Sequence, residues 1–178
     1  MRTFIVCTIL VFCCLLIGCG LQNFISIGHG IAVGESMSPT IKTGDHFGYS
    51  IFKTTETELI NRFDIIVFKV YAHSEEVITE DTMFVFRVIG LEGEKVELRN
   101  GKVFVNDKPL EENFEKIESN EDFAPIVVPV GEYFVLGDNR PESFDSRYWK
   151  YKTVKRKDIL GIVGNIIRKE DYEKGKRW

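Results

Sequence analysis

The chain has 178 residues, 44% of them hydrophobic and 28% charged, so its size and composition are those of one globular domain with a hydrophobic core. Its net charge of −4 lacks the basic excess of nucleic-acid-binding proteins, which argues against a nucleic-acid partner. The four cysteines (Cys7, Cys13, Cys14 and Cys19) precede residue 22, so residues 22–178 carry neither a disulfide framework nor a cysteine metal site.

Residues 4–21 form an apolar run of 18 residues without a charge. As a helix rising about 1.5 Å per residue, this run would reach about 27 Å, close to the thickness of a bilayer core. Residues 1–21 are therefore predicted to be an N-terminal membrane anchor, with Arg2 on the cytoplasmic side. Two alternatives stay open: a cleaved secretory signal, and a lipoprotein signal in which Cys19 carries the lipid. Both the anchor and the lipoprotein signal hold residues 22–178 against the outer face of a membrane.

The segments that follow are predicted to be strands joined by turns. Runs rich in β-branched and aromatic residues occupy 63–71 and 83–91. The Asn-Gly pair at 100–101 lies between apolar runs at 95–98 and 102–105, which predicts a β-hairpin. This half of the chain therefore has the pattern of an antiparallel β domain.

The second half continues this pattern. Further strands are expected at 126–130, 133–136 and 159–168, the last with glycines that indicate bulges. Residues 111–122 are acidic and mostly polar, which predicts a loop between strands, and the charged tail at 169–178 is expected to be loose. No helical periodicity follows residue 21, so residues 22–178 are predicted to be one all-β, barrel-like domain.

A serine on a turn is the first candidate for chemistry. Ser36 lies in GESMSPT at 34–40, where Gly34 and Pro39 are incompatible with a regular helix or a central strand. A serine on such a turn can be exposed, and it becomes a nucleophile when a neighbouring group takes its proton. The motif by itself leaves an ordinary turn serine equally open.

Four segments, in the right order, resemble the sequence boxes of the type I signal peptidases, serine peptidases of the S26 family that use a Ser/Lys pair. They are GESMSPT at 34–40, DIIVF at 64–68, RVIGLEGE at 87–94 and GDNRPESFDSR at 137–147. The resemblance implies an all-β, signal-peptidase-like pseudo-barrel with an N-terminal membrane-spanning helix. It also implies cleavage of exported preproteins after a small residue, without a metal or other cofactor; the three scattered histidines likewise show no metal-ligand spacing.

The resemblance assigns roles to individual positions. Ser36 matches the nucleophile, and Gly34 stands where the family places a group that supports the oxyanion. Ser143 matches the residue that orients the lysine by a hydrogen bond. Asp145 and Arg147 match a pair that supports the site, for which a structural salt bridge is also a sufficient role.

Position 86 departs from the family pattern. The family has lysine immediately before Arg-x-x-Gly-Leu, and this lysine is the general base because its apolar setting lowers its pKa. Here Phe86 precedes Arg87, and an arginine is effectively always protonated and cannot replace the base. Lys69 and the histidines lie outside the matching position. The fold is therefore expected to survive, because an aromatic ring fills the apolar space of the lysine stem, while Ser/Lys cleavage is expected to suffer.

Three functions stay open at this point. The first is an active signal peptidase with an unrecognised base; the second is a pseudoprotease that binds signal-peptide-like segments or assists a second signal peptidase; the third is a lipid-anchored surface protein that keeps only the scaffold. The expected partners are exported preproteins or signal-peptide segments and the membrane. The expected location is the bacterial plasma membrane, with a single N-terminal span and the C-terminal domain outside the cytoplasm.

Overall fold

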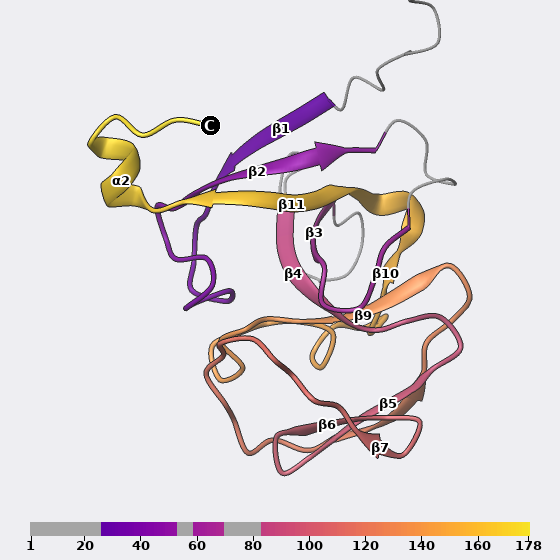
Figure 1. Cartoon of the computed structure of the whole chain (residues 1–178). Coiled ribbons are helices and arrows are strands. Elements are labelled where there is room, and N and C mark those ends of the chain that lie inside the picture. Colours follow the sequence, from indigo (N-terminus) through magenta and orange to yellow (C-terminus); the bar gives the residue numbers. More distant parts are fainter. Residues whose placement is uncertain (1–25, 53–58, 70–82) are drawn as a thin grey trace, which may run out of the picture.

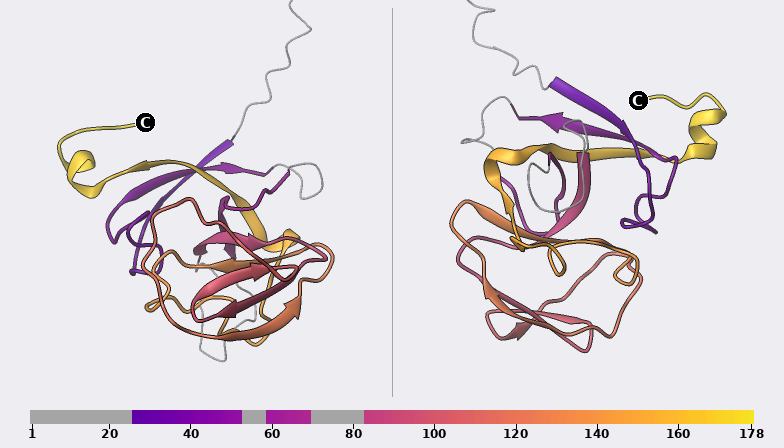
Figure 2. Two further views of the ribbon diagram at one scale, coloured as in Figure 1. Left: turned by 60° about the horizontal axis from the view of Figure 1, so that its bottom comes forward. Right: turned by 180° about the vertical axis from the view of Figure 1, so that it is seen from behind.

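The computed structural model describes residues 26–52, 59–69 and 83–178, and these form two antiparallel sheets with long loops between them (Figure 1). The larger sheet has the strand order β1-β2-β11-β3-β4-β9-β10, and the smaller has the order β7-β6-β5-β8. Figure 2 shows the smaller sheet at one end of the molecule and β1, β2 and α2 at the other. The prediction of a mostly β domain is confirmed for these residues.

Several strands lie on the runs predicted from the sequence, whereas β8 begins at Phe123, before the predicted 126–130. The larger sheet consists of β1 Ser26–Ile31, β2 His46–Ile51, β3 Ile65–Lys69, β4 Met83–Gly90, β9 Glu132–Leu136, β10 Val154–Lys155 and β11 Ile159–Ile167. The smaller sheet consists of β5 Lys95–Arg99, β6 Lys102–Val105, β7 Lys108–Pro109 and β8 Phe123–Val127. The helices in the described part of the chain are short: η1 Arg156–Asp158 and α2 Lys169–Glu173.

The predicted membrane anchor at 1–21 lies outside the described residues, and so does Cys19. Among residues 26–52, 59–69 and 83–178, no helix has both the length and the apolar composition to cross a bilayer.

Two of the three hydrophobic clusters among the described residues meet along β9. Side chains alternate across a strand, so Val135 faces the core that contains Phe68, while Phe134 and Leu136 face the core that contains Leu98. All three β9 residues are fully buried. Strand β9 is therefore covered on both faces, and it fixes the position of the 137–147 segment that follows it.

The predicted hairpin at 95–105 is confirmed. Strands β5 and β6 pair from Val96↔Val105 to Arg99↔Lys102. Asn100 and Gly101 between them have φ angles of 48° and 75°, the left-handed conformations that a two-residue hairpin turn requires. The bulges expected in the last strand also occur, as register shifts at Ile159/Gly161 and Val163/Asn165 in β11.

Strands β1 and β2 escaped the sequence analysis, and their glycines explain why. Gly28 lies opposite Tyr49 and Gly30 lies opposite Phe47. A Cβ atom at either glycine would come within 2.3 Å of the facing ring, so each ring covers the strand backbone where a side chain would otherwise stand. Glycine lowers the strand signal of the sequence, although here it makes room for the aromatic partner.

The prediction of a loose tail at 169–178 is wrong. The carboxylate of Asp45 accepts hydrogen bonds from the Arg168 guanidinium at 2.7 Å and from the Lys169 amide at 2.9 Å, which holds the start of α2. Beyond it, the Tyr172 ring stacks on His46 with centroids 3.5 Å apart, and Trp178 meets His29 edge-on at 5.6 Å. The tail is ordered by β1 and β2, which are distant in sequence, and its own composition gives no sign of this.

Candidate functional site

Ser36 lies on the turn that follows β1. Gly34 has a φ of +92°, a conformation that favours glycine, and its carbonyl accepts a hydrogen bond from Thr43 Oγ1 at 2.9 Å. The Ser38 amide then donates to the Glu35 carbonyl at 3.0 Å, closing a tight turn around the serine. Ser36 is half-buried on this turn, as expected for a side chain that faces a pocket.

The segment after β9 packs directly against this turn. The Asn139 amide donates to the Ser36 carbonyl at 3.0 Å. A Cβ atom at Gly137 would lie 2.2 Å from Ser143 Oγ and 2.4 Å from the Ser36 carbonyl oxygen, so only glycine allows this approach. The structure therefore brings the Ser36 backbone and the Ser143 side chain together at Gly137.

Asp145 and Arg147 form the support of this segment. Asp145 is fully buried and accepts hydrogen bonds from the Gly137 amide at 3.0 Å and from Arg147 Nε at 2.9 Å. Burial disfavours the charged form of Arg147, but the hydrogen bond and charge of Asp145 outweigh it and raise the pKa of the guanidinium above its ordinary value. The pair fixes the backbone beside Ser36 and does not line the pocket at Ser36.

A second buried ion pair joins β4 to the same segment. Arg87 donates to both carboxylate oxygens of Asp138, at 2.8 Å from Nε and 2.6 Å from Nη2. Thr40 Oγ1 donates to the same carboxylate, and Arg87 Nη1 donates to the Phe63 carbonyl at 2.9 Å. The sequence analysis assigned no role to Asp138 and did not identify it as the partner of Arg87. No local pattern marks this pair, because the two residues lie 51 positions apart in the sequence.

Phe86 is buried in an aromatic cluster, with 3% of its surface exposed. Its ring stacks on Phe84 with centroids 6.2 Å apart, lies 6.1 Å from Phe68 and meets Trp149 edge-on at 5.6 Å. Ser143 Oγ is also buried and has no hydrogen-bond partner among the residues that the structure describes. A hydrocarbon ring thus stands at the predicted base position, and the hydroxyl predicted to orient that base is unpaired.

Ser36 and Phe86 line one cavity of about 500 Å³. It lies between the end of β1, the Ser36 turn and the start of β4, and it is lined by Gly30, Ile31, Ala32, Val33, Gly34, Ser36, Met37, Ile41, Phe47, Met83, Phe84, Val85, Phe86 and Phe144. None of these described residues is ionisable. This cavity, called here the Ser36 pocket, suits apolar and uncharged groups. Its described lining contains the Ser36 hydroxyl but no side chain that could act as a base.

The comparisons with known proteins agree with this arrangement of segments. Residues 2–167 match the family described as signal peptidase, peptidase S26. The chain belongs to this family. The resemblance seen in the sequence is thereby confirmed at the level of the family, while the roles of individual residues stay predictions.

Relatives of this signal peptidase family member cover most of its chain. The signal peptidase I of Leptolyngbya laminosa is 35% identical over 147 residues, 80% of this chain and 68% of that protein. The probable signal peptidase I-2 of Synechocystis is 34% identical over 144 residues, 80% of this chain and 63% of that protein. A crystal structure of a signal peptidase I from Enterococcus faecalis shares 34% identity over 60% of this chain and 98% of that chain, with a TM-score of 0.48.

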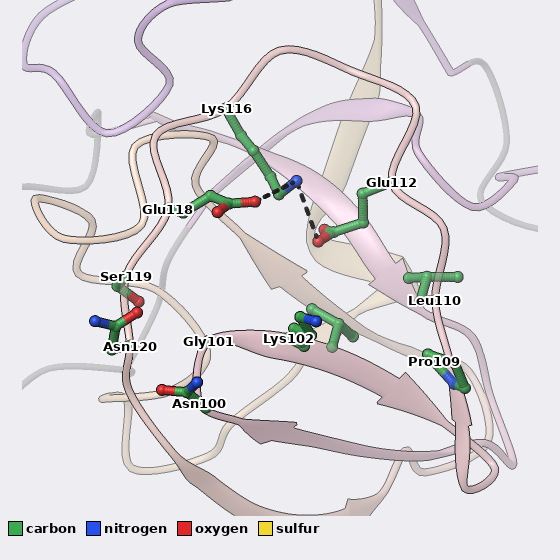
Figure 3. A pocket seen from close by; sticks show the side chains of 11 residues that line it. Asn100, Gly101, Lys102, Pro109, Leu110, Glu112, Lys116, Glu118, Ser119 and Asn120 are labelled. Atoms are coloured by element: carbon green, nitrogen blue, oxygen red, sulfur yellow. Dashed lines mark ion pairs between the residues drawn. The ribbon is translucent and has the colours of Figure 1, made fainter.

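A second cavity, of about 390 Å³, lies over the β5–β6 hairpin and is polar (Figure 3). Lys116 Nζ lies there 3.4 Å from Glu118 and 3.9 Å from Glu112. Glu112 also pairs with the buried guanidinium of Arg140. These charges are satisfied by one another, and Ser36 lines only the first cavity of the two.

No group of three or more His, Cys, Asp or Glu is gathered for a metal ion in the described ranges. His29 and His46, predicted to be scattered, in fact meet across β1 and β2, with His29 Nε2 2.9 Å from His46 Nδ1. His73 lies outside the described residues.

Proposed function

We propose that this signal peptidase family member binds signal-peptide-like segments of exported proteins in the Ser36 pocket and does not cleave them efficiently by Ser/Lys chemistry. The observation that carries this proposal is the packing of Phe86 among three aromatic rings, beside a serine pocket whose described lining residues include none that is ionisable. A serine hydroxyl needs a group that accepts its proton before it can attack a carbonyl. Phenylalanine offers no such group.

Peptide binding is supported by the open edge of β4. Strand β3 pairs with β4 over Met83 to Arg87, whereas β9 pairs with it only over Arg87 to Gly90. Residues 83–86 therefore have a strand partner on one side only, among the described residues, and all four of them line the Ser36 pocket beside that edge. An extended peptide can hydrogen-bond to such an edge while its side chains enter the pocket.

The residues that pack around Gly137 support the same proposal and allow a direct test of it. Ser36, Ser143, Asp145 and Arg147 keep positions around Gly137 that suit a serine peptidase. Loss of a nucleophile–base unit costs about a million-fold in rate in a serine protease. We therefore expect full-length protein in detergent to leave a labelled preprotein intact, and Phe86→Lys to cleave it, because the family resemblance assigns Ser143 to orient such a lysine and the Ser143 hydroxyl is unpaired among the described residues.

The controls separate this proposal from the alternative of an active peptidase with another base. Cleavage by the natural chain that disappears in Ser36→Ala would overturn the proposal and establish the active enzyme. Phe86→Lys/Ser36→Ala should be silent, which assigns any restored cleavage to Ser36. Direct binding of a labelled signal-peptide segment to Ser36→Ala checks the first half of the proposal independently of cleavage.

Attachment to the outer face of the bacterial plasma membrane completes the proposed function. It rests on the apolar run at 4–21, and the signal anchor is the proposed form, with the lipid on Cys19 as the alternative. The mass of the mature N-terminus distinguishes them, because a diacylglycerol adduct on Cys19 would exclude the simple anchor.

A further inference from the structure

Phe144 is an exposed aromatic ring that lines the Ser36 pocket. Its side chain is 55% exposed, and it shares the pocket lining with Ser36 and Phe86. Its backbone is fixed, because Trp149 Nε1 donates to the Phe144 carbonyl at 3.0 Å and Trp149 is buried. A large apolar ring is thus exposed to solvent at the lining of the pocket, on a backbone carbonyl that is bonded to a buried tryptophan.

Tyr148 extends this ring into a flat surface. The two rings are stacked, with centroids 5.8 Å apart and planes 12° from parallel, and we call the pair the aromatic shelf. The Tyr148 hydroxyl donates to the Glu121 carboxylate at 2.5 Å, and the Arg147 guanidinium carbon lies 5.0 Å from the Tyr148 centroid. Both contacts hold the second ring in place beneath the first.

The charges around the shelf restrict what can bind there. Burial, and after it the hydrogen bond to Glu121, raise the pKa of Tyr148 to about 12, so the phenol stays neutral at physiological pH. The Glu121 carboxylate is already paired with Arg147 Nη1 at 2.5 Å. An acidic group of a ligand would be repelled by the Glu121 carboxylate, and Arg147 is already paired with that carboxylate. An aromatic ring of a ligand would instead gain a stacking partner.

We propose that the aromatic shelf of Phe144 and Tyr148 recognises an aromatic side chain of the bound peptide. This inference rests on the proposed function, because its ligand is the segment bound in the Ser36 pocket. The proposal restricts the ligand to extended segments that carry Phe, Tyr or Trp at one fixed position relative to the residue bound at Ser36. Segments with an acidic residue at that position are expected to bind poorly. Phe144 is then a specificity-determining residue.

The test is a peptide scan against matched variants. Full-length protein in detergent, with Ser36→Ala as background to prevent turnover, is titrated with labelled signal-peptide segments in which one Phe replaces Ala at successive positions. One position should bind about three- to tenfold more tightly, the gain expected of an aromatic pair. Phe144→Ala should abolish that gain and Phe144→Tyr should keep it. Tyr151→Ala is the matched control, because Tyr151 is also 55% exposed and does not belong to the pocket lining.

The outcomes separate the shelf from the proposed function. If the segments bind but the preferred position persists unchanged in Phe144→Ala, or is weakened equally by Tyr151→Ala, the shelf is overturned while peptide binding stands. If none of the segments binds to the Ser36→Ala protein, in which Phe144 and Tyr148 are intact, both proposals are wrong. Thermal unfolding of Phe144→Ala checks that the weaker binding at the preferred position does not come from misfolding. Phe144→Tyr, which keeps an aromatic ring, is a second control for this.

Discussion

At the scale of single residues, Phe86 and Ser143 are both buried, but their surroundings satisfy them differently. The ring of Phe86 lies in contact with Phe84, Phe68 and Trp149, so its apolar environment is complete. The Ser143 hydroxyl is equally buried, yet it has no hydrogen-bond partner among the described residues. A buried hydroxyl without a partner has lost its bonds to water and gained none in return. The described residues thus satisfy the apolar ring of Phe86 and leave the Ser143 hydroxyl without a partner.

Comparison of two buried serines tests this interpretation. Ser143→Ala should change the free energy of unfolding by less than about 1 kcal/mol, or raise it, because no hydrogen bond is lost. Ser146→Ala should lower it by about 1–3 kcal/mol, because Ser146 Oγ accepts a bond at 3.0 Å from the Val135 amide, which would be left buried and unpaired. Urea unfolding measures both. A loss in Ser143→Ala as large as in Ser146→Ala would mean that the hydroxyl has a partner.

At the scale of elements, the C-terminal tail and the β1–β2 pair depend on each other. The Trp178 ring lies against Gly48, 3.7 Å from the position of a Cβ atom there, and Tyr172 stacks on His46. Burial, then the nearby His29 and Arg177, lower the pKa of His46 below its ordinary value, although Asp45 opposes this. The neutral imidazole is therefore the form that the folded tail prefers.

Acid should loosen the tail for this reason. A histidine whose pKa is lowered by folding stabilises the folded form above its ordinary pKa, about 6.5, and this stabilisation is lost as the pH falls through the lower, folded value. The fluorescence difference between the natural chain and Trp178→Phe isolates Trp178 from Trp149, and it should change below about pH 6.5. His46→Phe keeps a ring that can stack but cannot be charged, so its tail should not respond. A response unchanged in His46→Phe would contradict this assignment.

At the scale of the whole molecule, the acidic loop at 111–122 connects the smaller sheet to the segment beside Ser36. At one end Glu112 pairs with Arg140, and at the other Glu121 pairs with Arg147. Between them the Ile117 amide donates to the Asp138 carbonyl at 2.8 Å. The loop is held along its length, which explains how a polar segment without regular secondary structure keeps one path across the molecule.

The Glu112–Arg140 pair should therefore matter for stability. The two side chains are 5% and 1% exposed, so Glu112→Gln would leave a buried guanidinium charge without its counter-ion and lower the free energy of unfolding by about 3–5 kcal/mol. Asp107→Asn is the control, because the Lys95–Asp107 pair is 37% and 64% exposed and should contribute less than about 1 kcal/mol. Equal losses in the two variants, measured by urea unfolding, would contradict the argument.

The sequence by itself determined the β character, the hairpin at Asn100-Gly101 and the family. These features depend on local patterns: runs of β-branched and aromatic residues, turn residues that tolerate positive φ, and motifs whose spacing is written along the chain. The sequence did not predict strands β1 and β2, because Gly28 and Gly30 weaken the strand pattern and their space is filled by rings of the facing strand. The sequence did not predict the ordered tail, because the residues that bind the tail, Asp45 and His46, are far from it in sequence.

Only the tertiary structure decided what surrounds the serine. It placed the Ser143 side chain and the Ser36 backbone against Gly137, paired Arg87 with Asp138, and left the Ser143 hydroxyl unpaired among the described residues. It also showed that Phe144 joins Ser36 in one pocket. The contacts of Ser36 and Arg87 join residues that are 51 or more positions apart, and burial and ion pairing between such segments are set by packing and not by any local pattern.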